Sequence, residues 1–273
     1  MGHIIEVQHM KTRNKKAHVK KLSKDEYINL STGEICQYEH NENRAQNANS
    51  LAKSFKALRY LINNNFVGNK NELFITLTFA KESFDTEMIY KDCEKFIKRL
   101  KHHYKDKSTI DYINVVEPHA SGQFHTHMLL RFNDVDEIHM TNARLSNLWT
   151  HGLVDVKTLE QVDNIGAYLS AYLSDLELPD NAPYHADRED IVVKESNGKK
   201  KKFLKGGRLQ FYPSGMRIVR SSRGIKKPER QRMTYGEIKK EVKGANPHFS
   251  KSVTLSSDDY SNTITYEQYN LKR

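Results

Sequence analysis

The chain has 273 residues, of which 37% are hydrophobic and 29% charged, and its formal net charge is +10. This composition is typical of a soluble globular protein and excludes an intrinsically disordered one. No apolar run reaches the roughly 18 residues that a transmembrane helix needs, and the N-terminus lacks the apolar core of a signal peptide, so we expect a cytoplasmic protein with no membrane partner.

The excess of positive charge favours a polyanionic partner, most simply nucleic acid. Lysines and arginines gather in three segments, KTRNKKAHVKKLSK (11–24), KKKKFLKGGR (199–208) and RSSRGIKKPERQR (220–232). Each segment could equally be a solvated loop or face. The two cysteines, Cys36 and Cys93, are distant from each other and neither lies in a CxxC pair, so we expect no disulfide framework and no zinc finger.

The first half of the chain alternates predicted helices and strands. Residues 1–25 read as a basic arm, and residues 26–39 carry a hairpin pattern around a Ser-Thr-Gly turn. Leu51, Phe55, Leu58 and Ile62 have helical spacing, and ELFITLTFA (72–80) has the β-branched and aromatic content of a central strand. A second helix buries Ile89, Cys93, Phe96, Leu100 and Tyr104, with Ser83 or Asp85 as its N-cap.

The next segments predict a hairpin followed by two helices and a strand. IDYINVVE (110–117) and SGQFHTHMLLRF (121–132) are strands joined by a loop so short that they must pair antiparallel. A helix is predicted from about residue 141 to 149, a strand over 153–160, and a helix over 162–177 with Asp163 or Asn164 as N-cap. Beyond Pro179 the chain turns polar and basic, with a hairpin expected over 208–224, a helix over 234–242 and a polar tail. The order predicts an α+β fold, a central antiparallel β-sheet flanked by helices.

Two histidines in the second hairpin strand are candidate metal ligands. His125 and His127 share one face of the strand because their positions differ by two. Glu117, on the partner strand, should lie opposite Phe124 or His125, and the second register puts its carboxylate beside both imidazoles. Two histidines and a carboxylate suit a divalent ion, Mn²⁺ or Mg²⁺ acting on phosphate, and zinc also fits. His119 is a substitute ligand, and a hydrogen-bonded histidine pair is the simpler alternative.

Two tyrosines lie one turn apart on the last predicted helix of this series. Tyr168 and Tyr172 share a face, which ordinary amphipathic packing would also explain. Beside a metal-bound phosphate, a tyrosine hydroxyl could act as a nucleophile and form a covalent phosphotyrosine link. Thr76 and Thr78 form a small polar face that could line the floor of a DNA groove or simply pack in the sheet.

The segments FITLTF, VVEPHASGQFHTHMLL and YLSAY, in this order, resemble the three motifs of HUH-type endonucleases. These are the rolling-circle replication initiators (Rep proteins) of small plasmids and phages, which are related to relaxases. YLSAY and the later FYPSGMRIVRSSRGIKKP are most similar to the group that contains the filamentous-phage replication initiator and Gram-positive plasmid and mobile-element proteins. The resemblance spans roughly residues 50–225. Thr126 departs from it, because the residue between the histidines is usually a bulky hydrophobe.

The resemblance implies residue roles and a domain plan. His125, His127 and Glu117 would be the metal ligands, and Tyr168 and Tyr172 the nucleophiles. Tyr172 stands where single-tyrosine relatives have a lysine, which supports a two-tyrosine mechanism. The chain would divide into a basic N-terminal arm with a hairpin (1–47), an HUH nuclease domain (48–225) and a basic, polar C-terminal extension (226–273).

The implied activity is site- and strand-specific nicking and rejoining of single-stranded DNA at an origin or its hairpin, to initiate rolling-circle replication in a bacterial cytoplasm with host helicase and polymerase. The residues expected to contact DNA are Thr76, Thr78, Arg217, Arg220, Arg223, Lys226 and Lys227. Three alternatives stay open. A relaxase or transposase would use the same chemistry, a histidine-triad nucleotide hydrolase would need a third histidine where Leu129 stands, and a non-catalytic origin-binding protein would use the histidines structurally.

Overall fold

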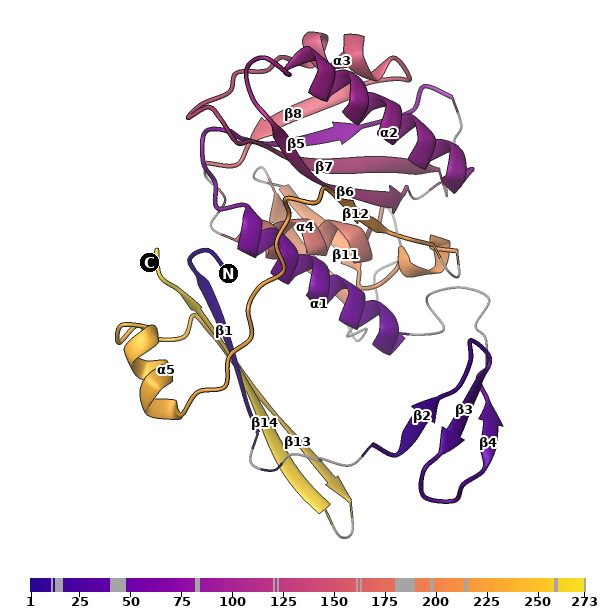
Figure 1. The fold of residues 1–273 in the computed structure, drawn as a ribbon, viewed down its shortest axis with the longest axis vertical. Helices are drawn as coiled ribbons and strands as arrows, with labels where there is room; N and C mark the ends of the chain where they lie inside the picture. The colour runs from indigo at the N-terminus through magenta and orange to yellow at the C-terminus, as the bar shows by residue number, and fades with distance from the viewer. Residues whose placement is uncertain are drawn as a thin grey trace. The chain divides into compact units, whose positions relative to one another are not determined.

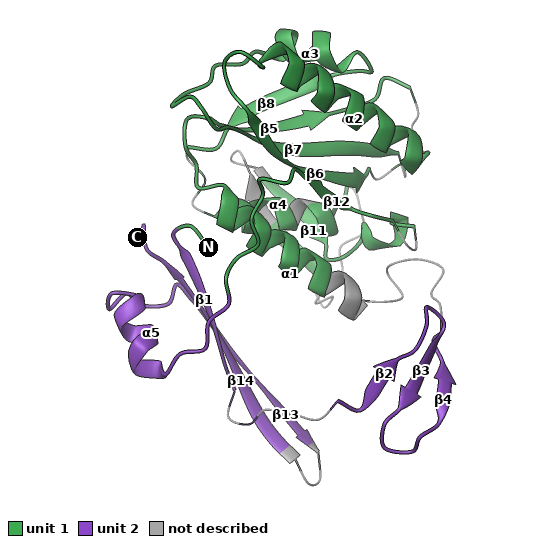
Figure 2. Cartoon of the chain, viewed as in Figure 1, with its two compact units in different colours: residues 1–2, 43–229 green, residues 3–42, 230–273 purple. Residues whose placement is uncertain are grey.

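The computed structural model describes residues 1–10, 12, 17–39, 48–81, 84–119, 121, 123–160, 162, 164–179, 190–196, 199–213, 216–257 and 260–272. The chain forms two compact units, coloured separately in Figure 2. One unit comprises residues 1–2 and 43–229, and the other residues 3–42 and 230–273. Among the described residues, no helix is both long and apolar enough to cross a membrane.

The first unit follows the predicted order of helices and strands. Its elements up to residue 174 are α1 (Ala48–Asn65), β5 (Glu72–Leu77), α2 (Thr86–His103), β6 (Ile110–Pro118), β7 (Phe124–Phe132), α3 (Asn142–Trp149), β8 (Val154–Thr158) and α4 (Ile165–Ser174). With β12 (Val219–Ser221), the strands form a five-stranded sheet in the order β12-β6-β7-β5-β8 (Figure 1), in which every neighbouring pair is antiparallel. The predicted α+β fold with a central antiparallel sheet flanked by helices is confirmed.

The central sheet has an apolar core on each face, as its alternating strands require. On one face, Ile113 and Leu129 lie across a pocket from Leu169 and Leu173 of α4. On the other face, the hydroxyl of Thr126 interacts with the thiol of Cys93 on α2. The residues predicted to form the buried face of α2 are all buried in the structure.

Side chains cap the helices where the sequence predicts. Asp85 accepts hydrogen bonds from the backbone N–H groups of Glu87 and Met88 at the start of α2. Asn164 accepts from the N–H of Ala167 at the start of α4. The alternative caps, Ser83 and Asp163, lie outside the described residues.

Helix α1 holds the N-terminus of α4 against the unit. Asn63 donates through Nδ2 to Oδ1 of Asn164, at 3.0 Å, and accepts from the N–H of Gly166, at 2.9 Å. A Cβ on Gly166 would lie 2.6 Å from the carbonyl oxygen of Arg59, so only glycine allows the two helices to approach this closely. The sequence predicted α4 but gave no sign of this anchor.

The hairpin predicted over 208–224 is wrong. Residues 209–211 form a short 3-10 helix, and β12 pairs with the distant β6 instead of with a neighbouring strand. The apolar side chains of this segment are used in the core of the unit, where Tyr212, Met216 and Ile218 are buried. Ahead of it, β9 (Leu176–Glu177), β10 (Ile191–Ser196) and β11 (Lys199–Leu204) form a small antiparallel sheet that the polar, basic composition concealed.

The described residues of the second unit form two three-stranded sheets and a helix. One sheet has the order β1-β14-β13 (Ile4–Met10, Tyr260–Asn270 and Phe249–Ser257), and the other has β2 (Val19–Lys21), β3 (Glu26–Asn29) and β4 (Ile35–Gln37). The hairpin predicted over 26–39 is confirmed as β3 and β4. The helix predicted over 234–242 is confirmed as α5 (Tyr235–Glu241), which begins with a capping box between Thr234 and Glu237.

Two segments of the second unit differ from expectation. Residues 1–25 were predicted to form a basic arm without strands, yet residues 4–10 form β1, which pairs with β14, and residues 19–21 form β2, which pairs with β3. The predicted polar tail forms β13 and β14. In β13 and β14, pairs of polar side chains face each other across the strands in place of the alternating apolar residues that identify a strand in a sequence. Ser252 and Thr265 lie 2.9 Å apart, and Thr254 and Thr263 lie 3.0 Å apart, between hydroxyl oxygens.

Candidate metal centre

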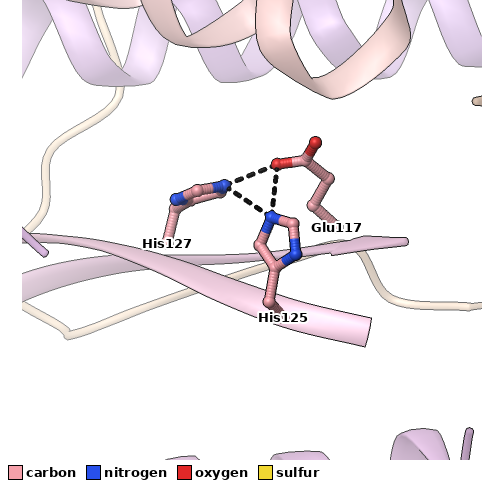
Figure 3. A group of neighbouring side chains, drawn as sticks. All are labelled: Glu117, His125 and His127. Carbon is pink, nitrogen blue, oxygen red and sulfur yellow. Dashed lines mark hydrogen bonds and ion pairs between the residues drawn. The ribbon is translucent and has the colours of Figure 1, made fainter. Parts of the chain in front are cut away.

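Glu117, His125 and His127 meet on one face of the β6–β7 hairpin. Of the two registers left open by the sequence, the structure has Glu117 directly opposite His125. Oε2 of Glu117 lies 3.1 Å from Nε2 of His125 and 2.5 Å from Nε2 of His127, and the two Nε2 atoms are 3.1 Å apart. Figure 3 shows the three polar atoms facing one another.

This donor set fits a divalent ion. Each of the three residues offers one ligand atom, and these atoms all lie within 4.8 Å of one another. Bonds of about 2.1 Å at right angles around a cation put neighbouring ligand atoms about 3 Å apart, close to the separations here. Without a cation, hydrogen bonds from the histidines to Oε2 can hold the same triangle, and a bound cation would take their place by accepting the lone pairs of the Nε2 atoms. Nitrogen and carboxylate ligands together suit Mn²⁺, Mg²⁺ or Zn²⁺, and the structure does not distinguish them.

The protonation states of the cluster suit metal binding as well. Burial alone would raise the pKa of Glu117, but hydrogen bonds with His125 and His127 outweigh it and hold the pKa at about 2. Burial lowers the pKa of His127 below its ordinary value, although its hydrogen bond with Glu117 acts in the opposite direction. An ionised carboxylate and a neutral imidazole are the forms that bind a cation.

Neighbouring side chains fix the orientation of His127. Thr76 lies opposite His127 on β5, and its Oγ1 is 3.0 Å from Nδ1 of the histidine. If Nδ1 carries the proton, Nε2 keeps its lone pair for a metal. The ring of Phe74 stacks on the same imidazole, with centroids 5.3 Å apart. His119, the substitute ligand, is exposed and contacts the ring of His125 edge-on, outside the three-residue cluster.

Tyr168 borders the same pocket as His127. A cavity of about 110 Å³ between α4 and the sheet is lined by both of these side chains, with Thr76, Lys157 and apolar residues completing the wall. The side chain of Tyr168 is 40% exposed, so the phenol is accessible from solvent. Tyr172 lies on α4 one turn later, and its side chain lies outside the described residues.

The other residues predicted to contact DNA are not among the three residues of the cluster. Thr78 donates its hydroxyl to the carbonyl of Leu153, at 3.0 Å. Arg220 pairs with Asn114, whose side chain bonds Thr126 on the opposite face of the sheet, and its guanidinium lies 3.7 Å above the ring of Tyr90. The remaining predicted contacts are all exposed, namely Arg217, Arg223, Lys226 and Lys227.

The sequence missed one charged residue at the cluster. Arg208 forms an ion pair through Nη1 with Oε1 of Glu117, and its side chain is 13% exposed. It belongs to a basic segment that was interpreted as a phosphate contact or a solvated loop, and its partner lies 91 positions earlier. Charge alone could not single it out from the lysines around it.

Residues 72–177 match the family model of the replication-associated protein ORF2/G2P. No curated protein and no solved structure matches the chain. The matched segment runs from the first residue of β5 to the last residue of β9, and it contains Thr76, Glu117, both histidines of the cluster and both tyrosines of α4.

Proposed function

We propose that the chain is a metal-dependent nickase that initiates rolling-circle DNA replication through a covalent 5′-phosphotyrosine intermediate, with its nuclease domain in residues 48–225. The observation that carries the proposal is the shared pocket of His127 and Tyr168, which puts a metal-ligand cluster beside an accessible phenol. The match to a replication-associated family supports a role in replication.

Each residue of the cluster has a defined task in this proposal. Glu117, His125 and His127 would hold a divalent ion, and its charge would polarise the scissile phosphate and stabilise the leaving oxygen. Thr76 keeps the His127 ring in the orientation that ligation needs. Helix α4, anchored by Asn63, presents Tyr168 to the phosphate.

The covalent step exchanges one phosphate ester for another. The phenol oxygen of Tyr168 bonds to phosphorus while the bond from phosphorus to the 3′ oxygen breaks. The phenol proton is released to solvent, and the leaving oxygen takes a proton to become a 3′ hydroxyl, which a host polymerase could extend. Rejoining reverses these changes, and Tyr172 would provide the second attack that releases a circle.

The basic segment after residue 216 would contact the phosphate backbone of the bound DNA. Arg220 lies on the α2 face, so its contact would involve flanking DNA and not the scissile phosphate. Arg217, Arg223, Lys226 and Lys227 would extend the same electrostatic contact without reading sequence.

Incubation with Mn²⁺ and labelled single-stranded candidate origin DNA tests the proposal. The wild-type chain should form a covalent protein–DNA adduct that chelator abolishes. Tyr168→Phe should reduce the adduct strongly while leaving Mn²⁺ affinity unchanged, and Tyr168→Phe/Tyr172→Phe should eliminate it. An adduct formed by the double variant would exclude both tyrosines as nucleophiles.

A relaxase or a transposase would share this chemistry. The family match gives more support to replication than to either. A transferred strand in a conjugation or transposition assay, without circle release from a replicon, would favour the mobile-element alternative.

A further inference from the structure

Arg208 lies where the end of helix α4 meets the turn after β11. Its backbone N–H donates to the carbonyl of Ser174, at 3.1 Å, and its Nε donates to the carbonyl of Asp175, at 2.8 Å. Carbonyls at a helix C-terminus have no partner within the helix, so Arg208 supplies two of the donors that this end needs. One end of the residue is therefore fixed to the tyrosine helix.

The far end of the same side chain is fixed to the metal cluster. Nη1 donates to the carbonyl of Pro118, at 3.0 Å, and forms an ion pair with Oε1 of Glu117. A guanidinium is planar and rigid, so a contact at Nε restricts where Nη1 can be. The side chain thus links the end of β6 to the end of α4.

The two carboxylate oxygens of Glu117 are consequently divided between different partners. Oε2 faces Nε2 of His125 and Nε2 of His127, whereas Oε1 faces Arg208. A carboxylate can bind a cation through one oxygen or through both. With Oε1 engaged by the partly buried guanidinium, Glu117 offers a single oxygen.

We infer that Arg208 is a positioning residue that restricts Glu117 to one-oxygen ligation and so leaves room on the cation for a phosphate oxygen. This inference rests on the proposed nickase function. Arg208 acts through Glu117 and does not touch the reacting atoms.

The inference predicts that metal binding and nicking respond differently to loss of the guanidinium. Removing a positive charge beside a cation favours cation binding, and the freed Oε1 can add a second bond. Metal affinity should therefore stay the same or increase. Nicking should fall, because the second bond occupies space that the phosphate needs. A purely structural role would make metal affinity and folding fall together.

The test uses the full chain with Arg208→Gln, Arg208→Lys and a matched control, Arg99→Gln. Arg99 is a half-buried arginine on α2 that donates to the carbonyl of Trp149, so its loss removes a similar group from a contact that does not involve Glu117. Mn²⁺ affinity is measured by calorimetry, folding by thermal melting, and nicking rate at saturating Mn²⁺ and DNA.

Arg208→Gln should bind Mn²⁺ at least as tightly as wild type and nick roughly tenfold or more slowly, the usual range for a residue that orients a metal ligand. Arg208→Lys, which keeps the charge, should have a Mn²⁺ affinity and a nicking rate between those of wild type and Arg208→Gln. Arg99→Gln should match wild type in both measurements. Weaker Mn²⁺ binding by both Arg208 variants, or wild-type nicking by Arg208→Gln, would overturn the inference. A wild-type chain that binds no Mn²⁺ or forms no adduct would instead refute the proposed function.

Discussion

The two faces of strand β7 carry polar side chains with different roles. Toward α4, His125 and His127 meet Glu117 at the edge of a solvent-accessible pocket. Toward α2, Thr126 is fully buried and donates to Oδ1 of Asn114, at 2.5 Å, within the core. Both faces contain polar groups, but only the α4 face gathers them where a ligand can reach. The comparison suggests that chemistry and stability are separated by strand alternation.

The largest expected effect comes from a substitution that removes a metal ligand from the α4 face and leaves the α2 face unchanged. His127→Ala removes a metal ligand, so Mn²⁺ binding should be lost and nicking should fall by about three orders of magnitude, because several kcal/mol of charge stabilisation disappear. Thr126→Val is the matched change on the other face. It leaves Asn114 without its partner and should cost roughly 1–3 kcal/mol of unfolding free energy while Mn²⁺ affinity stays the same.

Calorimetry, nicking assays and thermal melts on these two variants test whether metal binding and stability depend on different faces of β7. If Thr126→Val lowers Mn²⁺ affinity as much as it lowers stability, the two faces are not independent.

A smaller effect on metal affinity is expected from a substitution in β5. Thr76→Val removes the hydroxyl that lies beside Nδ1 of His127, and Mn²⁺ affinity should fall about 10- to 100-fold. Thr78→Val is the control, because that hydroxyl bonds the carbonyl of Leu153 and contacts no ligand. Titration of Mn²⁺ into each variant measures the difference, and equal affinities would show that Thr76 does not orient the ring.

In metal-free protein, the pH dependence of the unfolding free energy should reflect the titration of Glu117 and His127 on the α4 face. The pKa of Glu117 is about 2, below its ordinary 4.5, and that of His127 is also below its ordinary 6.5. Both groups bind fewer protons when folded, so their contributions are present at neutral pH. They are lost as pH falls, from about 6.5 downward for His127 and between 4.5 and 2 for Glu117.

Urea unfolding in chelator from pH 7 to pH 3 measures this loss. Glu117→Gln should show a shallower fall in unfolding free energy than wild type below pH 4.5. Thr126→Val, which changes no titrating group, should show the wild-type slope from a lower starting value. Parallel curves for wild type and Glu117→Gln would contradict the assignment.

The smallest effect concerns the thiols. Burial raises the pKa of Cys93 to about 11, so Cys93 should resist alkylation in native protein near pH 8. Cys36 is only partly buried and should be alkylated faster. Mass spectrometry before and after unfolding counts the labelled thiols. Modification of Cys93 in the folded chain, at a rate like that of Cys36, would show that the α2 face opens readily.

The sequence predicted those parts of the molecule that depend on local pattern. Alternation placed His125 and His127 on one face, helical spacing placed Tyr168 on α4, and the short loop required the β6–β7 hairpin. The register that puts Glu117 opposite His125 needed the structure, because a shift of one residue is compatible with the same pattern.

Long-range contacts escaped sequence reasoning. Arg208 reaches Glu117 and Asn63 reaches Gly166 across separations that no periodicity encodes. Strand β12 was mistaken for half of a hairpin because its true partner, β6, lies about a hundred residues earlier. The strands β13 and β14 were overlooked because hydroxyl side chains replace the apolar alternation by which strands are recognised.

Anomalous diffraction from crystals grown with Mn²⁺ tests the central claim most directly. The account predicts one strong peak within bonding distance of Nε2 of His125, Nε2 of His127 and one oxygen of Glu117, on the side that faces Tyr168. Crystals of active protein in which Mn²⁺ binds elsewhere, with the three side chains still bonded only to one another, would contradict it.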